Sequence, residues 1–125
     1  MEIPGWHPTP LNFLVSNRNF WAKTRRKDAD AVTVYSYCMY ASPRVTAAIG
    51  PREVRLTIVL GPRQRANDPD NYPKSAMDAL RKCGALLDDN RQWSRCPPPT
   101  FIRGASIMTI IKLADVGEAD RALKG

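Results

Sequence analysis

Histidine and cysteine are scarce in this 125-residue chain, and each scarcity argues against a class of site. The single histidine, His7, lies near the N-terminus, where we expect a surface or loop residue and not a catalytic one. The three cysteines are odd in number, and no two of them form a Cys-x-x-Cys pair. We therefore expect neither a disulfide framework nor a zinc site, as in a protein of the reducing cytoplasm.

Long apolar runs are also absent. No stretch approaches the roughly 20 apolar residues that cross a bilayer, and the first ten residues lack both the basic start and the apolar run of a signal peptide. With 43% hydrophobic and 25% charged residues, the composition is that of an ordinary globular protein. We expect a single domain over residues 1–125, located in the cytoplasm and without a membrane partner.

Acidic residues are outnumbered, with 12 Asp and Glu against 19 Lys and Arg, so that the net charge is +7. A polyanion such as nucleic acid is the natural partner of this imbalance. Five of the 12 acids are nevertheless aspartates within one 22-residue stretch: Asp68, Asp70, Asp78, Asp88 and Asp89. A protein that binds phosphates is expected to present such carboxylates to them only with a cation in between.

Local patterns in the first third of the chain predict one short extended segment and one long helix. Three prolines make residues 1–12 an extended, turn-rich segment with at most a short strand. No Gly or Pro interrupts the chain from about Arg18 to Ala41, and Ser16 and Asn17 are good N-cap residues. Apolar positions at 32, 35 and 39, with 31 and 38 beside them, follow helical spacing, so we predict a single helix here.

The rest of the sequence predicts a second helix with strands before and after it along the chain. REVRLTIVL at 52–60 alternates as a half-buried strand does. Residues 71–83 carry a helical apolar stripe, and Gly84 follows where a C-cap glycine belongs. Strands near 91–96 and 106–113 are expected to form a hairpin, and 114–125 a flexible tail. The whole is a compact α/β (α+β) domain, with a mixed sheet of about four strands and two main helices.

The Asp68-Pro69-Asp70 sequence has a geometric consequence. Proline favours an extended backbone in its neighbourhood, so the two aspartates are expected to project in the same direction. Either Asp70 or the next residue, Asn71, is expected to cap the second helix, with Pro73 in its first turn. This places Lys74 on the same helix face as Asp78. Two parallel carboxylates repel unless a cation lies between them, and Mg²⁺ prefers such oxygen ligands.

An alternative without function fits the same spacing. Asp, Pro and Asn are common loop residues, and a Lys–Asp pair at i,i+4 is an ordinary surface pair. A calcium-binding EF-hand, by contrast, is excluded. Pro73 stands where its loop requires glycine, and Ala79 stands where a bidentate glutamate belongs.

The string DPDNYPKSAMDALRKCGALLDD resembles the signature of the RusA family of crossover-junction endodeoxyribonucleases. The matching positions, with their spacing intact, are Asp68, Asp70, Asn71, Lys74, Asp78, Leu80, Gly84, Asp88 and Asp89. A weaker likeness covers roughly residues 8–113. The resemblance implies a RusA-like fold and a homodimer that cuts four-way (Holliday) DNA junctions symmetrically in recombination and repair. It also implies metal-binding carboxylates at Asp68, Asp70 and Asp89, a catalytic lysine at Lys74, and Mg²⁺ as cofactor, with Mn²⁺ as a possible substitute.

Basic residues near these positions are candidates for contacts to the DNA backbone: Arg63, Arg65, Arg81, Lys82 and the run Arg25, Arg26 and Lys27. A solvated helix face explains the triple run equally well. Two other functions stay open beside the resolvase. One is a nuclease of the same fold that cuts flap or other branched DNA. The other is a catalytically silent DNA-binding protein, which the retained acidic set disfavours.

Overall fold

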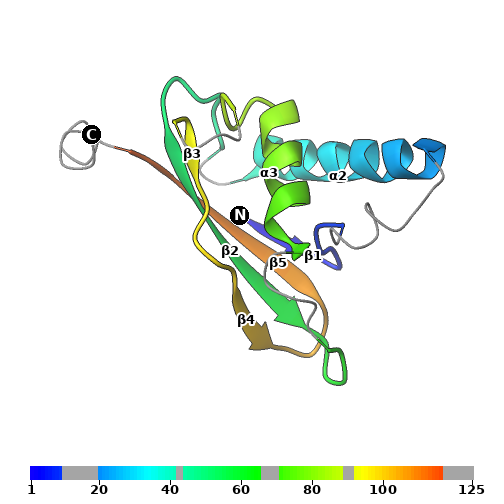
Figure 1. Cartoon of the computed structure of the whole chain (residues 1–125). Helices are drawn as coiled ribbons and strands as arrows, with labels where there is room; N and C mark the ends of the chain where they lie inside the picture. The colour runs from blue at the N-terminus through cyan, green and yellow to red at the C-terminus, as the bar shows by residue number, and fades with distance from the viewer. Residues whose placement is uncertain (10–19, 42–43, 66–70, 89–91, 117–125) are drawn as a thin grey trace.

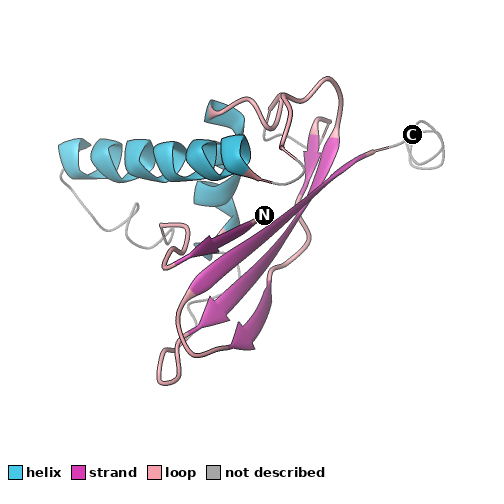
Figure 2. Cartoon of the chain, turned by 180° about the vertical axis from the view of Figure 1, so that it is seen from behind, coloured by secondary structure: helices cyan, strands magenta, loops and turns pink. Residues whose placement is uncertain are grey.

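The structure, a computed structural model, describes residues 1–9, 20–41, 44–65, 71–88 and 92–116. Its elements are β1 (Glu2–Pro4), α2 (Phe20–Tyr40), β2 (Arg52–Leu60), α3 (Pro73–Lys82), β3 (Ser94–Arg95), β4 (Thr100–Arg103) and β5 (Met108–Asp115). The strands form one mixed sheet, and both helices lie on the same side of it (Figures 1 and 2). The predicted α+β class and the two main helices are confirmed, and the sheet has five strands where about four were expected.

Strand β2 is the centre of the sheet. β5 pairs with it in antiparallel register along nearly its whole length, from Arg52↔Asp115 to Val59↔Met108. The short N-terminal strand β1 pairs with the outer edge of β5. The alternation predicted for residues 52–60 is confirmed, because Val54, Leu56 and Ile58 are buried while Arg55 is exposed. β2 therefore anchors both helices on one face and leaves charged side chains on the other.

Strands β3 and β4 occupy the second edge of β2 as two pieces of an interrupted strand. Both pair with β2 in parallel, β3 with the start of β2 and β4 with its end. Between them lie Pro97, Pro98 and Pro99, which have no backbone N–H to donate to a ladder. The prolines thus explain the gap between β3 and β4.

The hairpin predicted for the last two strands is wrong. β4 and β5 lie on opposite edges of β2 and pair with it, one in parallel and the other in antiparallel orientation. The turn between them passes the C-terminal end of β2, where the Gly104 N–H donates to the Leu60 carbonyl at 2.9 Å. An added Cβ on Gly104 would lie only 2.8 Å from Val59 Cγ1. The turn can pass so close to β2 because residue 104 is a glycine.

The long helix α2 is confirmed, but of the apolar positions that predicted it only Cys38 is buried. Val34 and Cys38 belong to the main core cluster, and Asp30, one turn earlier, is 6% exposed. Positions 32, 35 and 39 are exposed. Asp30 is buried at low cost because its carboxylate accepts hydrogen bonds from Trp6 Nε1 and from the N–H and hydroxyl of Thr9. These bonds also attach the N-terminal segment to α2.

Helix α3 ends as predicted at a glycine. Gly84 has a positive φ of 83°, and its N–H donates to the Arg81 carbonyl. The Ala85 N–H donates to the Leu80 carbonyl at 2.9 Å, which completes a Schellman motif. Leu80 itself is fully buried, and replacing such a side chain with alanine typically costs about 2–5 kcal/mol.

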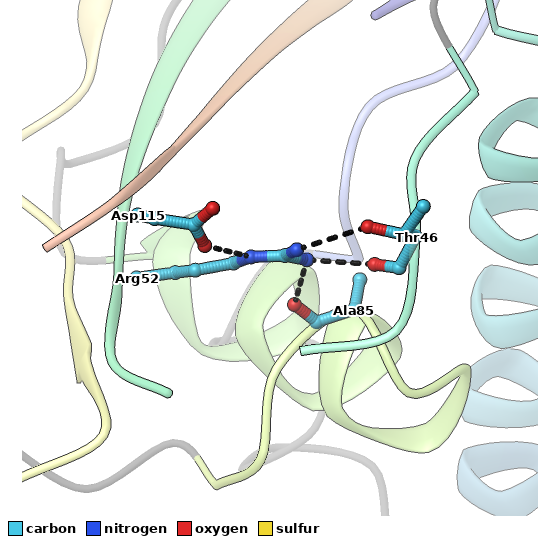
Figure 3. Close-up of polar contacts among 4 residues, drawn as sticks. All are labelled: Thr46, Arg52, Ala85 and Asp115. Carbon is cyan, nitrogen blue, oxygen red and sulfur yellow. Dashed lines mark hydrogen bonds and ion pairs between the residues drawn. The ribbon is translucent and has the colours of Figure 1, made fainter. Parts of the chain in front are cut away.

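A buried arginine joins the start of β2 to its surroundings. Arg52, 7% exposed, donates to Asp115 at the end of β5, to Thr46 and to the Ala85 carbonyl after α3 (Figure 3). The Val116 N–H also bonds to the Pro51 carbonyl at 3.0 Å. The expected flexible tail therefore does not begin at residue 114, because the sheet includes Ala114 and Asp115. Residues 117–125 lie outside the described part of the chain.

No helix in the described ranges combines the length and the apolar character needed to cross a membrane.

Candidate active site

The tight turn after β2 opens the region that carries the predicted site. The Gly61 N–H donates to Gln64 Oε1 at 3.1 Å, and the Gln64 N–H donates back to the Gly61 carbonyl at 3.2 Å. Arg103, the last residue of β4, donates to the carbonyls of Gly61 and Gln64 at 2.6 and 3.0 Å. The turn is thus held from within and from a neighbouring strand, and it presents the exposed Arg63 and Arg65.

Helix α3 begins just beyond this turn, and its first residues are set by packing. Tyr72 is the N-cap residue and makes no side-chain cap hydrogen bond. Its ring is 1% exposed and lies edge-on against Phe101, with 5.5 Å between ring centroids. The N-cap residue is therefore Tyr72 and not Asn71, and Asp70, the other predicted cap, lies outside the described residues. The buried aromatic ring and Pro73 at the first helical position determine the start.

Lys74 follows in the first turn of α3, as predicted, with an exposed side chain. Its ammonium lies 3.9 Å from Asp78 Oδ2, an i,i+4 pair in which the Asp78 side chain is only 14% exposed. At this distance the ion pair is weak, and only its Lys74 end is well exposed to solvent. The Lys74 ammonium is therefore accessible to solvent beside a largely buried carboxylate.

His7, expected to be a surface or loop residue, lies in a loop after β1, and its ring is half-buried next to Tyr72. Its Nε2 lies 2.8 Å from the Val59 carbonyl, so the Nε2 proton is donated there. The ring also packs edge-on against Tyr72, with centroids 6.1 Å apart. The sequence did not indicate this burial, because nothing near His7 in the chain points to the carbonyl of Val59. His7 supports the base of α3.

A cavity of about 430 Å³ lies beside this aromatic group. Its lining residues come from the N-terminal segment, α2, the turn after β2 and the start of α3: Gly5, Trp6, His7, Pro8, Arg26, Ala29, Asp30, Thr33, Gln64, Tyr72 and Ile107. The cavity shows that Arg26 of the basic run lies at the same end of the molecule as the turn after β2. A larger cavity of about 1060 Å³ lies elsewhere, between the end of α2 and β5.

The other predicted DNA-contact residues are more dispersed. Arg81 is exposed in the last turn of α3, about 10 Å along the helix from Lys74. Lys82, beside it, pairs with Asp28 of α2 at 3.7 Å. In the basic run of α2, Arg25 is exposed and Lys27 is partly buried. The basic side chains therefore lie near both ends of α3 and do not form one compact patch.

The predicted metal ligands Asp68, Asp70 and Asp89 lie outside the described residues, so their convergence stays a prediction. The described residues that flank the first two are Arg65, in the turn after β2, and Asn71, just before α3. The segments on either side of Asp89 meet the opposite end of β2. Arg52 binds the Ala85 carbonyl with its side chain and the Trp93 carbonyl with its N–H. Among the described residues no group of three or more His, Cys, Asp or Glu could hold a metal ion.

Comparison with known proteins adds no family or relative. No protein-family model matches the chain, and no curated protein matches it.

Proposed function

We propose that this chain is a Mg²⁺-dependent endodeoxyribonuclease of the RusA type, which resolves four-way DNA junctions by paired, symmetric phosphodiester hydrolysis. The observation that carries the proposal is the spacing of the string from Asp68 to Asp89, in which three aspartates and Lys74 keep their relative positions without a gap. The exposed Lys74 and its weak contact with Asp78 support a role for this ammonium toward an anionic substrate.

In this proposal the residues divide the work of phosphodiester hydrolysis. Asp68, Asp70 and Asp89 would hold Mg²⁺, which would lower the pKa of a water molecule and neutralise charge on the phosphate. Lys74 directs its ammonium at the charge that develops on the phosphoryl group or on the leaving oxygen. Its place in the first turn of α3, behind the packed Tyr72 ring, suits a group that must be held still relative to the reacting atoms.

The basic residues hold the DNA without reading its sequence, through contacts to phosphates. Arg63 and Arg65 project from the turn that Arg103 clamps, and Arg26 lines the cavity on the same side. Arg25, Lys27, Arg81 and Lys82 extend the positive surface along the two helices. Contacts to the phosphates of the DNA backbone suit a substrate that is recognised by its branched shape and not by its base sequence. We place the reaction in the cytoplasm, where such DNA is found in a prokaryotic cell.

The decisive experiment compares substrates. The protein is incubated with a labelled four-way junction, a flap and a linear duplex, each with and without Mg²⁺. The proposal expects Mg²⁺-dependent, symmetric cuts in the junction and slow or no cleavage of the duplex. Equal cleavage of flap and junction supports the general branched-DNA nuclease. Binding without cleavage of any substrate supports the silent DNA-binding protein.

The Asp70→Asn variant tests the metal-binding role separately. We expect cleavage to be abolished while junction binding survives or tightens, because a negative charge next to phosphates is removed. Replacing Mg²⁺ with Ca²⁺ is expected to preserve the complex and stall hydrolysis, since the larger ion relaxes the coordination geometry. Gel-shift and cleavage assays on one preparation measure both. A variant that loses folding, by circular dichroism, together with binding would instead give Asp70 a structural role.

A further inference from the structure

The outer edge of β5 is covered by β1 only along its first part. The Ile111 N–H donates to the Met1 carbonyl at 2.8 Å, and the Met1 ammonium donates to the Ile111 carbonyl at 2.9 Å. β5 continues past this pair to Asp115 (Figures 1 and 2). Alternate residues of an antiparallel strand bond to the same neighbour, so the N–H and carbonyl groups of Leu113 and Asp115 point outward as those of Ile111 do. Within the described ranges these groups have no backbone partner, and we call this stretch the open edge of β5.

A groove of about 1060 Å³ lies along the open edge. On the side of the helices it has an apolar wall, formed by the end of α2, the segment that follows it and β5: Tyr37, Tyr40, Val45 and Leu113. Val45 and Leu113 pack against the main core cluster, whereas the Tyr40 side chain is 89% exposed. The apolar wall is therefore anchored in the core and open to a partner.

On the uncovered face of the sheet the same groove carries two opposed cations. Arg55 of β2 and Lys112 of β5 are directly opposite in the ladder, and both are exposed. Like charges in this position destabilise a sheet. Arg55 has Glu53 as a partner at 3.3 Å, and Lys112 makes no ion pair with any described residue. An anionic group placed next to β5 would relieve this repulsion.

The remaining charged residues of the lining leave the groove basic. Arg44, exposed in the segment after α2, makes no ion pair within the described part of the chain, and its guanidinium lies 2.9 Å from Met39 Sδ. The Asp115 carboxylate is already bound by Arg52 at 2.8 Å (Figure 3). Glu2 is the other acid of the lining. The surplus of positive charge favours an acidic partner.

We propose that this groove binds an extended peptide segment of another protein, in which apolar and acidic residues alternate. The segment adds to the sheet as an antiparallel strand along the open edge of β5, in line with β1. Because the side chains of a strand alternate between its two faces, every second residue contacts the apolar wall and the residues between lie beside Arg55 and Lys112. The groove lies near the start of β2, away from Lys74, so the proposal is independent of the nuclease function.

The test uses the full chain and a short, fluorescently labelled peptide of alternating valine and glutamate with blocked ends. We expect saturable binding by fluorescence anisotropy that weakens as salt is added. A peptide with lysine in place of glutamate should bind at least about tenfold more weakly, because its charges repel the cations of the groove. Hydrogen exchange should slow at the amides of Leu113 and Asp115 when the glutamate peptide binds, and both amides should exchange freely without it.

Backbone methylation of the peptide tests the strand pairing itself. A residue opposite Leu113 shares its face of the sheet and points its own N–H at β5, so the valines are the residues that donate to the open edge. N-methylation of the valines should therefore abolish binding, and N-methylation of the glutamates should preserve it. If both methylated peptides bind as the parent does, the peptide does not extend the sheet and the proposal fails.

Charge reversal in the protein completes the test. Arg55→Glu should weaken binding of the glutamate peptide at least about fivefold and should strengthen binding of the lysine peptide. Arg63→Glu, the same change in the turn at the other end of β2, is the matched control and should leave peptide binding unchanged. Amides of Leu113 and Asp115 that are already protected in the free protein would overturn the proposal, since this chain or a second copy then covers the edge. A single-stranded oligonucleotide that binds this groove, where the peptide does not, would overturn it in favour of nucleic acid.

Discussion

Lys74 carries the most specific prediction at the scale of single residues. If its ammonium acts on the transition state, Lys74→Ala should lower turnover by about 10²–10³-fold with little change in DNA affinity. Single-turnover cleavage at saturating junction measures the rate, and a gel shift measures affinity. Lys112→Ala, which removes an exposed lysine from the uncovered sheet face, is the control and should keep full turnover. Loss of affinity and of salt dependence at unchanged turnover would make Lys74 a mere phosphate contact.

Arg52 allows a stability prediction within one strand. Its replacement by alanine leaves the Ala85 and Thr46 carbonyls without their charged donor and should lower the free energy of unfolding by about 2–4 kcal/mol. Arg55→Ala, three residues along β2, removes an exposed side chain that pairs with Glu53 at 3.3 Å, and should cost less than about 1 kcal/mol. Urea unfolding of both variants tests this. Equal losses would show that the buried hydrogen bonds of Arg52 contribute nothing specific.

The same residues show where sequence patterns stop being informative. Alternate residues of a strand share one face, so residue 52 lies on the same face of β2 as Val54 and Leu56. The strand pattern could therefore have predicted that Arg52 faces the core. Nothing local indicates that its partners are a carbonyl after α3 and a carboxylate on β5. His7 is the same case, because its partner is the carbonyl of Val59, 52 residues away. Long-range polar contacts of this kind leave no periodic trace in a single sequence.

At the scale of elements, α2, β2 and α3 follow from apolar spacing, and the glycine after α3 from its backbone preference. Strand pairing does not follow. The hairpin between residues 91–96 and 106–113 was expected because neighbouring strands usually pair, but β2 is long and apolar enough to pair along both edges. On α2, the apolar spacing at 32, 35 and 39, with 31 and 38 beside it, indicates the helix correctly, but only Cys38 among these positions is buried. The buried face also includes Asp30, whose hydrogen-bond donors Trp6 and Thr9 are more than 20 residues away in the sequence.

Gly104 tests the unexpected connection between β4 and β5. A methyl group there would lie 2.8 Å from Val59 Cγ1, so either the turn or the strand must shift. We expect Gly104→Ala to destabilise the protein by about 1–3 kcal/mol, as overpacking typically does. Gly50→Ala is the control, since no atom lies within 4 Å of its added Cβ, and its effect should stay within about 0.5 kcal/mol. If the two substitutions cost the same, the turn does not pass the end of β2 as described.

At the scale of the whole molecule, the candidate site depends on segments from both ends of α3. The described neighbours of Asp70 and Asp89 are separated by that ten-residue helix, which is about 15 Å long. Their approach was a sequence prediction that rested on the family resemblance, and it stays one. The fold does establish where Lys74, in the first turn of α3, lies relative to Arg63 and Arg65 in the turn after β2. A structure with Mg²⁺ bound would test the remainder directly.

Assembly is the last property that follows from the proposed reaction. Two symmetric incisions need two active sites, and a 14.0 kDa chain with one acidic cluster supplies one. A two-fold homodimer is the simplest arrangement. The exposed stripe of Val32, Tyr35 and Met39 on α2, with exposed fractions of 65%, 50% and 37%, is the apolar surface that we expect to meet its own copy.

Sedimentation at micromolar concentration should therefore return about twice the chain mass. Tyr35→Glu should shift the protein toward the monomer, because a two-fold axis brings the two new carboxylates close together in an apolar contact. Ile49→Glu changes a side chain that is 95% exposed and not on α2, so it should leave the dimer intact. Junctions in a supercoiled plasmid should be cut in both strands by the dimer and nicked singly by the Tyr35 variant. A natural chain that is monomeric and nicks without correlation would contradict the resolvase and favour the branched-DNA nuclease.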